Sequence, residues 1–178
     1  MTATHYTPTP RSPSSGNHRG MLDVGAVLAR GAVAGLAGGV LFALANMWCA
    51  DAHGQPVVAP FLAISTIFHG TDMPVMSQPD VIAGLVTHLG LSLLLGMVFA
   101  LAVAMLRLAT RPLLLLGAGL IYGLALYVVI FQIIGRVAFP WFVNVKGPNQ
   151  IFELWIHPIA YGLVLVPFFL GFRATTRH

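Results

Sequence analysis

Four long apolar runs constrain this chain more than any other feature of its sequence. They cover roughly residues 24–50, 81–106, 112–134 and 151–172, and each is long enough to cross a hydrocarbon core of about 30 Å as a helix. Lipid offers no partner for backbone N–H and C=O groups, and the runs lack the alternation of barrel strands, so they must be α-helical. The sequence therefore predicts an all-α, polytopic membrane protein with four transmembrane helices.

The composition and the placement of charge support this prediction. Hydrophobic residues make up 57% of the 178 residues and charged residues only 8%, with a mean hydropathy of +0.85, which is outside the range of water-soluble globular domains. The positive-inside rule predicts that both termini are cytoplasmic, since basic residues gather before or near the start of the first run, between the second and third, and after the fourth. These residues are Arg11, Arg19, Arg30, Arg107, Arg111, Arg173 and Arg177. Because orientation accounts for the basicity, we expect no nucleic-acid partner.

The polar segments define the expected domain boundaries. Residues 1–20 are rich in Thr, Ser, Pro, Asn and His, which predicts a disordered cytoplasmic tail. Residues 21–173 form the transmembrane domain, and 174–178 form a second cytoplasmic tail. An outer loop is expected over 51–79. Within it, the apolar segment 57–68 is too short to span, so it should lie at the interface or re-enter the membrane.

Glycines recur at helical spacing in several of the runs. Gly31, Gly35 and Gly39 form an i, i+4, i+8 stripe in the first run, and a face without side chains lets another helix backbone approach closely. The same packing role is predicted for Gly84, Gly96, Gly119, Gly123 and Gly162. The first and third runs are rich in glycine, and the second and fourth each carry a histidine, which indicates two tandem helical hairpins.

Polar residues gather in the predicted outer halves of the helices. His88 and His157 lie at matched depth in the second and fourth runs, roughly 12 Å below their outer ends. Glu153, His157 and Tyr161 share one helical face at i, i+4, i+8, and Asn46 continues the glycine stripe of the first run. Ionisable groups facing lipid would cost at least a few kcal/mol each, so these faces should turn inward. We expect the two histidines to approach each other there.

Three interpretations of this polar layer stay open. The histidines could be neutral and hydrogen-bonded across helices, which would make them interhelical contacts only. They could ligate the iron of haem b or help to form a copper or zinc site. A copper or zinc site would be completed by further ligands chosen from His53, His69, Asp51, Asp72 or Glu153. They could belong to an ion or proton path, although the inner helix halves carry no polar continuation.

No enzyme is indicated by the sequence. It lacks a nucleophile–base pair in a recognisable context, a phosphate-binding glycine loop and paired carboxylates. We therefore expect a non-catalytic accessory or structural subunit whose glycine faces pack within a homo-oligomer or a larger membrane complex. A haem- or metal-binding protein is the alternative, and a small ion or proton transport component is the second alternative.

Three segments resemble a group of small, uncharacterised four-helix bacterial inner-membrane proteins, a domain family of unknown function. The segments are THLGLSLLLGMVFAL, GAGLIYGLALYVVIFQ and WIHPIAYGLVL. The matching positions are His88, Ser92, Gly96, Gly119, Tyr122, Gly123, His157, Tyr161 and Gly162. The resemblance covers about residues 31–171 and implies a multi-pass protein of the bacterial cytoplasmic membrane. It implies no biochemical activity, and Glu153 and Pro158 are not part of its pattern.

Overall fold

A computed structural model describes residues 23–70, 73–143 and 149–172. The two predicted tails, 1–20 and 174–178, lie outside the described residues. Helices make up the fold, and the described residues include no strand. Four of the helices are long and apolar enough to cross a membrane, which confirms the all-α prediction of four spans. These spans are Val24–Ala52, Gln78–Met105, Pro112–Ala138 and Gln150–Phe168.

The first two spans are single helices, whereas the last two are built from several helical segments. The first half of the chain contains α1 (Val24–Ala52), α2 (Ala59–His69), α3 (Gln78–Met105) and η1 (Leu108–Thr110). The third span joins α4 (Pro112–Tyr127), η2 (Val128–Gly135) and α5 (Arg136–Ala138), and η3 (Pro140–Val143) follows it. The fourth joins α6 (Gln150–Ile156), η4 (His157–Gly162), α7 (Leu163–Leu165) and η5 (Val166–Phe168). Both η2 and η4 are π-helical.

Local sequence signals explain where the helices begin. The Asp23 carboxylate accepts a hydrogen bond from the Ala26 N–H at the start of α1. Ser77 caps α3 in the same way, and Asn149 caps α6 by accepting from two backbone N–H groups. α4 begins directly at Pro112, a residue that suits the first helical turn because no N–H is needed there. α2 ends at Gly70, whose φ of 65° is left-handed.

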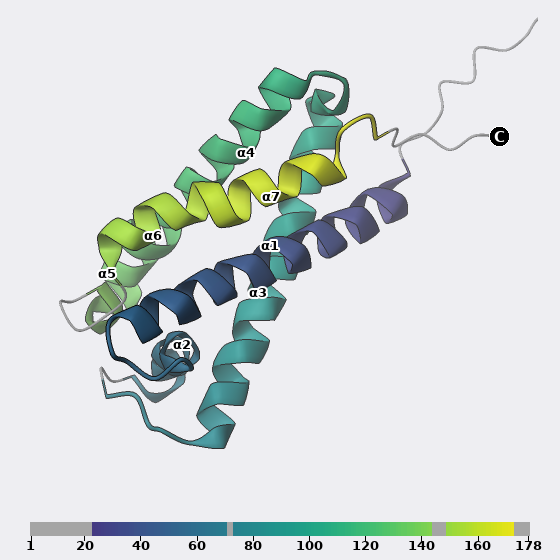
Figure 1. Cartoon of the computed structure of the whole chain (residues 1–178). Coiled ribbons are helices and arrows are strands. Elements are labelled where there is room, and N and C mark those ends of the chain that lie inside the picture. Colours follow the sequence, from purple (N-terminus) through teal and green to yellow (C-terminus); the bar gives the residue numbers. More distant parts are fainter. Residues whose placement is uncertain (1–22, 71–72, 144–148, 173–178) are drawn as a thin grey trace, which may run out of the picture.

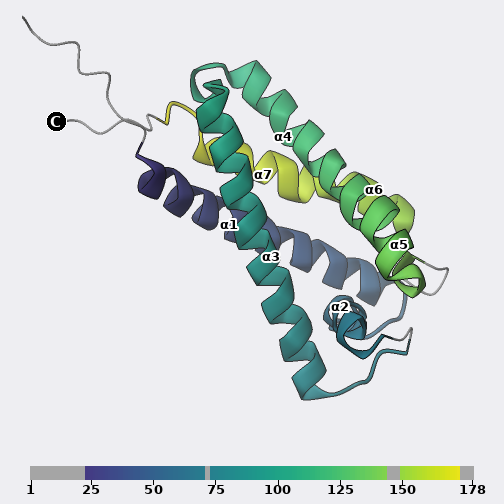
Figure 2. The ribbon, with the colours of Figure 1, turned by 180° about the vertical axis from the view of Figure 1, so that it is seen from behind.

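The helices pack as two pairs that also contact each other. α1 lies against α3, α4 lies against η4, and α1 also contacts η4 and α7. Figures 1 and 2 show α2 beside α1 and α3 at one end of the bundle, the same end as α5. We call this the α2 end. The opposite end holds the start of α1 and the connection from α3 to α4, and we call it the η1 end.

The predicted packing glycines face other elements of the same chain. Gly31 and Gly35 lie against Gly96 of α3, and a side chain on Gly35 would overlap the Ser92 carbonyl. Gly119 of α4 lies against Gly162 in the same close manner. Three further glycines are equally close to a neighbouring element: Gly39 to Ser92, Gly84 to the Phe61 carbonyl and Gly123 to the His157 carbonyl. The glycine faces are therefore used within the chain.

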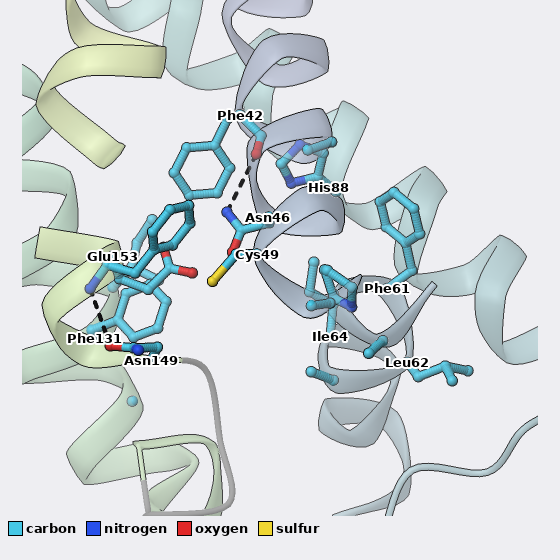
Figure 3. Close-up of a pocket in the computed structure, with 18 of the residues that line it drawn as sticks. Phe42, Asn46, Cys49, Phe61, Leu62, Ile64, His88, Phe131, Asn149 and Glu153 are labelled. Carbon is cyan, nitrogen blue, oxygen red and sulfur yellow. Dashed lines mark hydrogen bonds between the residues drawn. The ribbon is translucent and has the colours of Figure 1, made fainter. Parts of the chain in front are cut away.

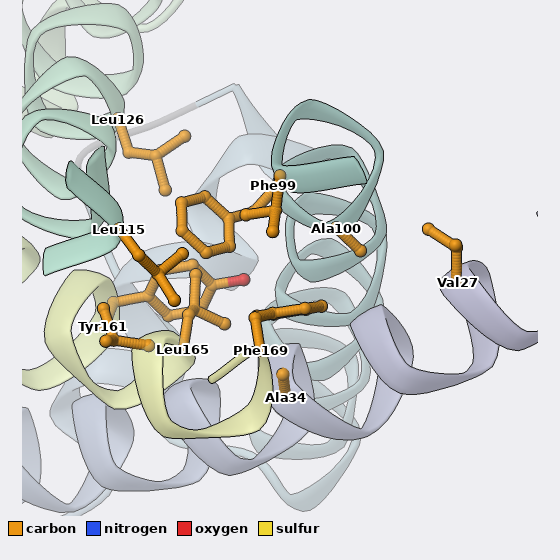
Figure 4. Packing of buried hydrophobic residues seen from close by; sticks show 11 residues of the cluster. Val27, Ala34, Phe99, Ala100, Leu115, Leu126, Tyr161, Leu165 and Phe169 are labelled. Atoms are coloured by element: carbon orange, nitrogen blue, oxygen red, sulfur yellow. The ribbon is translucent and has the colours of Figure 1, made fainter. Parts of the chain in front are cut away.

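The η1 end is filled by apolar side chains. Phe99, Phe169 and Leu115 are almost completely buried there, and the Phe99 ring meets the Phe169 ring edge-on at 5.6 Å. Figure 4 shows how side chains from α1, α3, α4 and α7 converge around Phe99. Because this half is closely packed with apolar groups, the open space in the molecule lies toward the α2 end.

Candidate ligand-binding site

A cavity of about 1340 Å³ lies at the α2 end. One wall comes from α1, α2 and α3, and the other comes from η2, α6 and η4 (Figure 3). The structure brings most of the predicted site residues to this one cavity, whose lining includes Asn46, His53, His88, Glu153, His157 and Tyr161. His69 does not line it. The remaining surface is mostly apolar.

His88 of α3 binds the backbone of α1. Its Nε2 lies 2.8 Å from the Gly39 carbonyl oxygen, and since a carbonyl can only accept, Nε2 carries the proton and donates it. The Ser92 hydroxyl donates to the His88 carbonyl at 2.8 Å. Because Nε2 is engaged with Gly39, only Nδ1 of His88 remains as an electron-pair donor. The His88 side chain therefore connects α3 to α1 by a hydrogen bond.

His157 has the opposite tautomer. Its Nδ1 lies 2.8 Å from the Glu153 carbonyl oxygen, one helical turn earlier, so Nδ1 donates and Nε2 keeps a free electron pair. Within the described part of the chain, Nε2 has no hydrogen-bond partner. Phe42, Phe131 and Tyr127 meet the imidazole edge-on, with ring centroids 4.6, 5.4 and 5.9 Å away. His157 thus sits in an aromatic surround with one acceptor nitrogen.

Phe42 of α1 is the residue that relates the two histidines. Its ring stacks on His88 at 5.9 Å and meets His157 at 4.6 Å. The two histidines, which were expected to approach each other, therefore both contact the same phenyl ring. Sequence reasoning missed Phe42 because a phenylalanine in an apolar helix carries no distinguishing signal. The only sequence signal is that Phe42 precedes Asn46 by one helical turn. In the structure, the Asn46 amide donates to the Phe42 carbonyl at 3.3 Å.

Glu153 is a buried carboxylate in the first turn of α6. The residue is 2% exposed, and its Oε2 has no hydrogen-bond partner among the described residues. The nearest basic atom is His157 Nδ1, 3.3 Å from Oε2, but the single proton of that nitrogen points to the Glu153 carbonyl oxygen. Buried polar groups are normally hydrogen-bonded, so an unsatisfied carboxylate oxygen requires an explanation.

Two tyrosines connect the helix pairs by hydrogen bonds. The Tyr161 hydroxyl donates to the Ser92 carbonyl at 2.5 Å, and the Tyr122 hydroxyl of α4 donates to the Leu95 carbonyl at 2.7 Å. Both acceptors lie on α3. Tyr161 therefore closes the deep end of the cavity and holds η4 to α3, which gives this predicted site residue a structural role.

The other two predicted histidines have local partners. His53 Nδ1 lies 2.7 Å from the Cys49 carbonyl oxygen near the end of α1. His69 Nε2 lies 2.6 Å from Asp80 Oδ1, and this contact joins the end of α2 to the start of α3. Among the described residues, no three His, Cys, Asp or Glu side chains come together to hold a metal ion. The copper or zinc alternative, like axial ligation of haem through His88 Nε2, gains no support from this geometry.

Two π-helical segments, η2 and η4, flank His157. π-Helical turns are rare in proteins, and many of those that do occur are found at functional sites. η2 provides Phe131 to the cavity wall, and η4 provides His157 itself. In η4 the Leu163 N–H donates to the Pro158 carbonyl, five residues back. Pro158 was a sequence signal for irregular geometry in the fourth span, whereas η2 contains no proline or other signal that could have predicted it.

Comparison with protein-family models, curated proteins and solved structures finds no match to this chain. Its class is therefore defined by the fold, as a multi-pass helical membrane protein with four candidate spans. Within that class, the particular feature is a large, mostly apolar cavity that contains one buried carboxylate.

Proposed function

We propose that this protein is a non-catalytic, multi-pass membrane protein that binds a lipophilic molecule in the cavity at its α2 end. The observation that carries the proposal is the cavity of about 1340 Å³, in which a mostly apolar wall surrounds a small group of polar side chains. Small-molecule sites are typically concave and apolar, with few polar groups that fix orientation. Here those groups are Glu153, His157 and Asn46.

The cavity is partly open to the surroundings of the helices. Wherever it is unfilled, the atoms that line it lose dispersion contacts, and an apolar wall is not stabilised by water. These three polar groups lie on α1, α6 and η4 and line one common space, so packing within the chain leaves them with room for a ligand. A lipophilic ligand restores the dispersion contacts of the cavity wall, and its own polar group can interact with the polar side chains there.

Orientation and location are part of the same proposal. The positive-inside pattern supports cytoplasmic termini, which would place the cavity in the outer half of a bacterial cytoplasmic membrane. The packed apolar η1 end supports a binding protein over a conduit, because Phe99, Leu115 and Phe169 leave no polar continuation there.

A role as an accessory subunit or homo-oligomer stays a second prediction. It was motivated by glycine faces, and those faces are occupied by α1–α3 and α4–η4 packing. The remaining support is the exposed apolar surface of the spans, which lipid alone accounts for. Purification in gentle detergent tests this role: a co-purifying membrane protein or a defined oligomer supports it, and a monodisperse monomer contradicts it.

A cavity-filling variant tests the proposed function. Ile64 of α2 lines the cavity, so Ile64→Trp should fill part of it and exclude the ligand. Leu94→Trp is the matched control, because Leu94 lies outside the cavity lining and is 54% exposed. Native mass spectrometry should show a non-covalently bound mass on the wild type and Leu94→Trp that Ile64→Trp lacks. Absence of bound mass in all three, or equal mass in all three, would contradict the proposal.

A further inference from the structure

One acidic side chain and three histidines are the ionisable groups of opposite kinds in the described cavity lining. Of the described residues that line it, Glu153 is the only Asp, Glu, Lys or Arg. The residue is almost completely buried and its Oε2 is without a hydrogen bond in the described part of the chain. The cavity therefore presents a buried carboxyl group with no Lys or Arg beside it, and its nearest basic neighbour is the His157 imidazole.

Groups near Glu153 within the chain are already engaged. The Nδ1 proton of His157 goes to the Glu153 carbonyl oxygen, and the Asn46 amide donates to the Phe42 carbonyl. The helix N-terminus favours a carboxylate in its first turn, but the N–H groups of Ile151 and Phe152 are bonded to the Asn149 side chain. None of these groups supplies the missing hydrogen bond to Oε2.

Aromatic rings lie on the cavity wall near this carboxylate. Phe42 and Phe131 both line the cavity and both contact His157. Figure 3 shows the Glu153 carboxylate directed toward the space that Phe42, Asn46 and Cys49 border from the α1 side. The ring faces of aromatic residues attract cations, and this attraction is stronger where water is excluded. A carboxylate beside aromatic rings is an arrangement that suits an organic cation.

We propose that the cavity selects lipophilic organic cations, with the positive group of the ligand placed at the Glu153 carboxylate and its apolar part against the cavity wall. This inference rests on the proposed binding function and names its ligand class. A bound cation supplies a positive partner for the Glu153 carboxyl group, beside which the described lining places no Lys or Arg. An anion of the same size and shape would meet repulsion there.

Tetraphenylphosphonium and tetraphenylborate are matched probes for this proposal, since they have nearly the same size and shape and opposite charge. The full-length protein in lipid nanodiscs is equilibrated with each probe, and saturable binding above empty nanodiscs is measured. The wild type should prefer the cation by about tenfold or more. Glu153→Gln should remove this preference. Asp51→Asn, which removes an exposed carboxylate at the same end, should retain it.

The outcomes separate this inference from the proposed function. Equal saturable binding of both probes, lost in Ile64→Trp, would overturn the cation inference and leave lipophilic binding intact. Persistence of the cation preference in Glu153→Gln would also overturn it. Failure of both probes to bind saturably, together with no bound mass on the purified protein, would overturn both proposals. Glu153→Met is a second variant of similar length with the same expected loss, in case Glu153→Gln does not fold.

Discussion

At the scale of single residues, the site depends on where each proton lies. His88 donates through Nε2 to Gly39 and His157 donates through Nδ1 to Glu153. These two bonds fix both tautomers, and no donor among the described residues reaches Glu153 Oε2. The sequence predicted that His88 and His157 lie at the same depth in the membrane, but it could not show which atoms their imidazoles bind.

The Tyr161 hydroxyl provides a prediction at this scale. Tyr161→Phe removes the hydrogen bond to the Ser92 carbonyl and leaves the ring packing unchanged. We expect the free energy of unfolding to fall by about 0.5–1.5 kcal/mol, measured by denaturant titration in mixed micelles. An unchanged unfolding midpoint would show that this bond does not hold η4 to α3.

At the scale of elements, α1 and α3 approach closely because small residues face each other. Gly35→Ala would place a Cβ against the Ser92 carbonyl and the Gly96 backbone, so the helices must separate. We expect a loss of about 1–3 kcal/mol in the free energy of unfolding. Gly90→Ala is the matched control, since nothing lies near its added Cβ, and it should be neutral or stabilising by up to about 1 kcal/mol. Equal effects of the two changes would contradict the packing.

The short helix α2 is held to the bundle at defined contacts. The Trp141 indole N–H donates to the Thr66 hydroxyl at 3.2 Å, and Gly84 lies against the Phe61 carbonyl. Trp141→Phe should loosen α2 and speed amide hydrogen exchange over residues 59–69. Trp48→Phe is the control, because Trp48 is 69% exposed, and it should leave this exchange unchanged. Unchanged exchange in Trp141→Phe would show that the hydrogen bond does not hold α2.

Sequence and structure agree best where an element is determined by local pattern. The apolar runs predicted the spans, and the short apolar segment after the first run became α2, although the sequence did not show which helices it would pack against. The fourth span ends at Phe168, earlier than the apolar run, because its last turn is the 3-10 segment η5 and the left-handed Gly171 follows. Three features of the site were not predictable from helix periodicity: the position of Phe42 between the histidines, the π-helical geometry of η2 and the unpaired Glu153 oxygen. All three depend on tertiary contacts.

At the scale of the whole molecule, the predicted orientation can be measured with single cysteines. Cys49 is the only cysteine, so Cys49→Ala gives a background without thiols. Gln55→Cys lies at the α2 end and Thr110→Cys at the η1 end, and both positions are exposed. A membrane-impermeant maleimide added to intact spheroplasts should label only the first, and the second should react after permeabilisation. The reverse pattern would invert the proposed topology.

The central claim is that a lipophilic molecule occupies the cavity, and photocrosslinking with a diazirine-bearing hydrocarbon probe in nanodiscs tests it most directly. We predict saturable labelling concentrated in residues 59–69 and 128–135, which contribute to the cavity wall. Tetraphenylphosphonium should reduce this labelling more than tetraphenylborate in the wild type, and the two should reduce it equally in Glu153→Gln. Unsaturable labelling spread over lipid-facing side chains such as Leu94 and Ile121, with no concentration at the cavity, would contradict the claim.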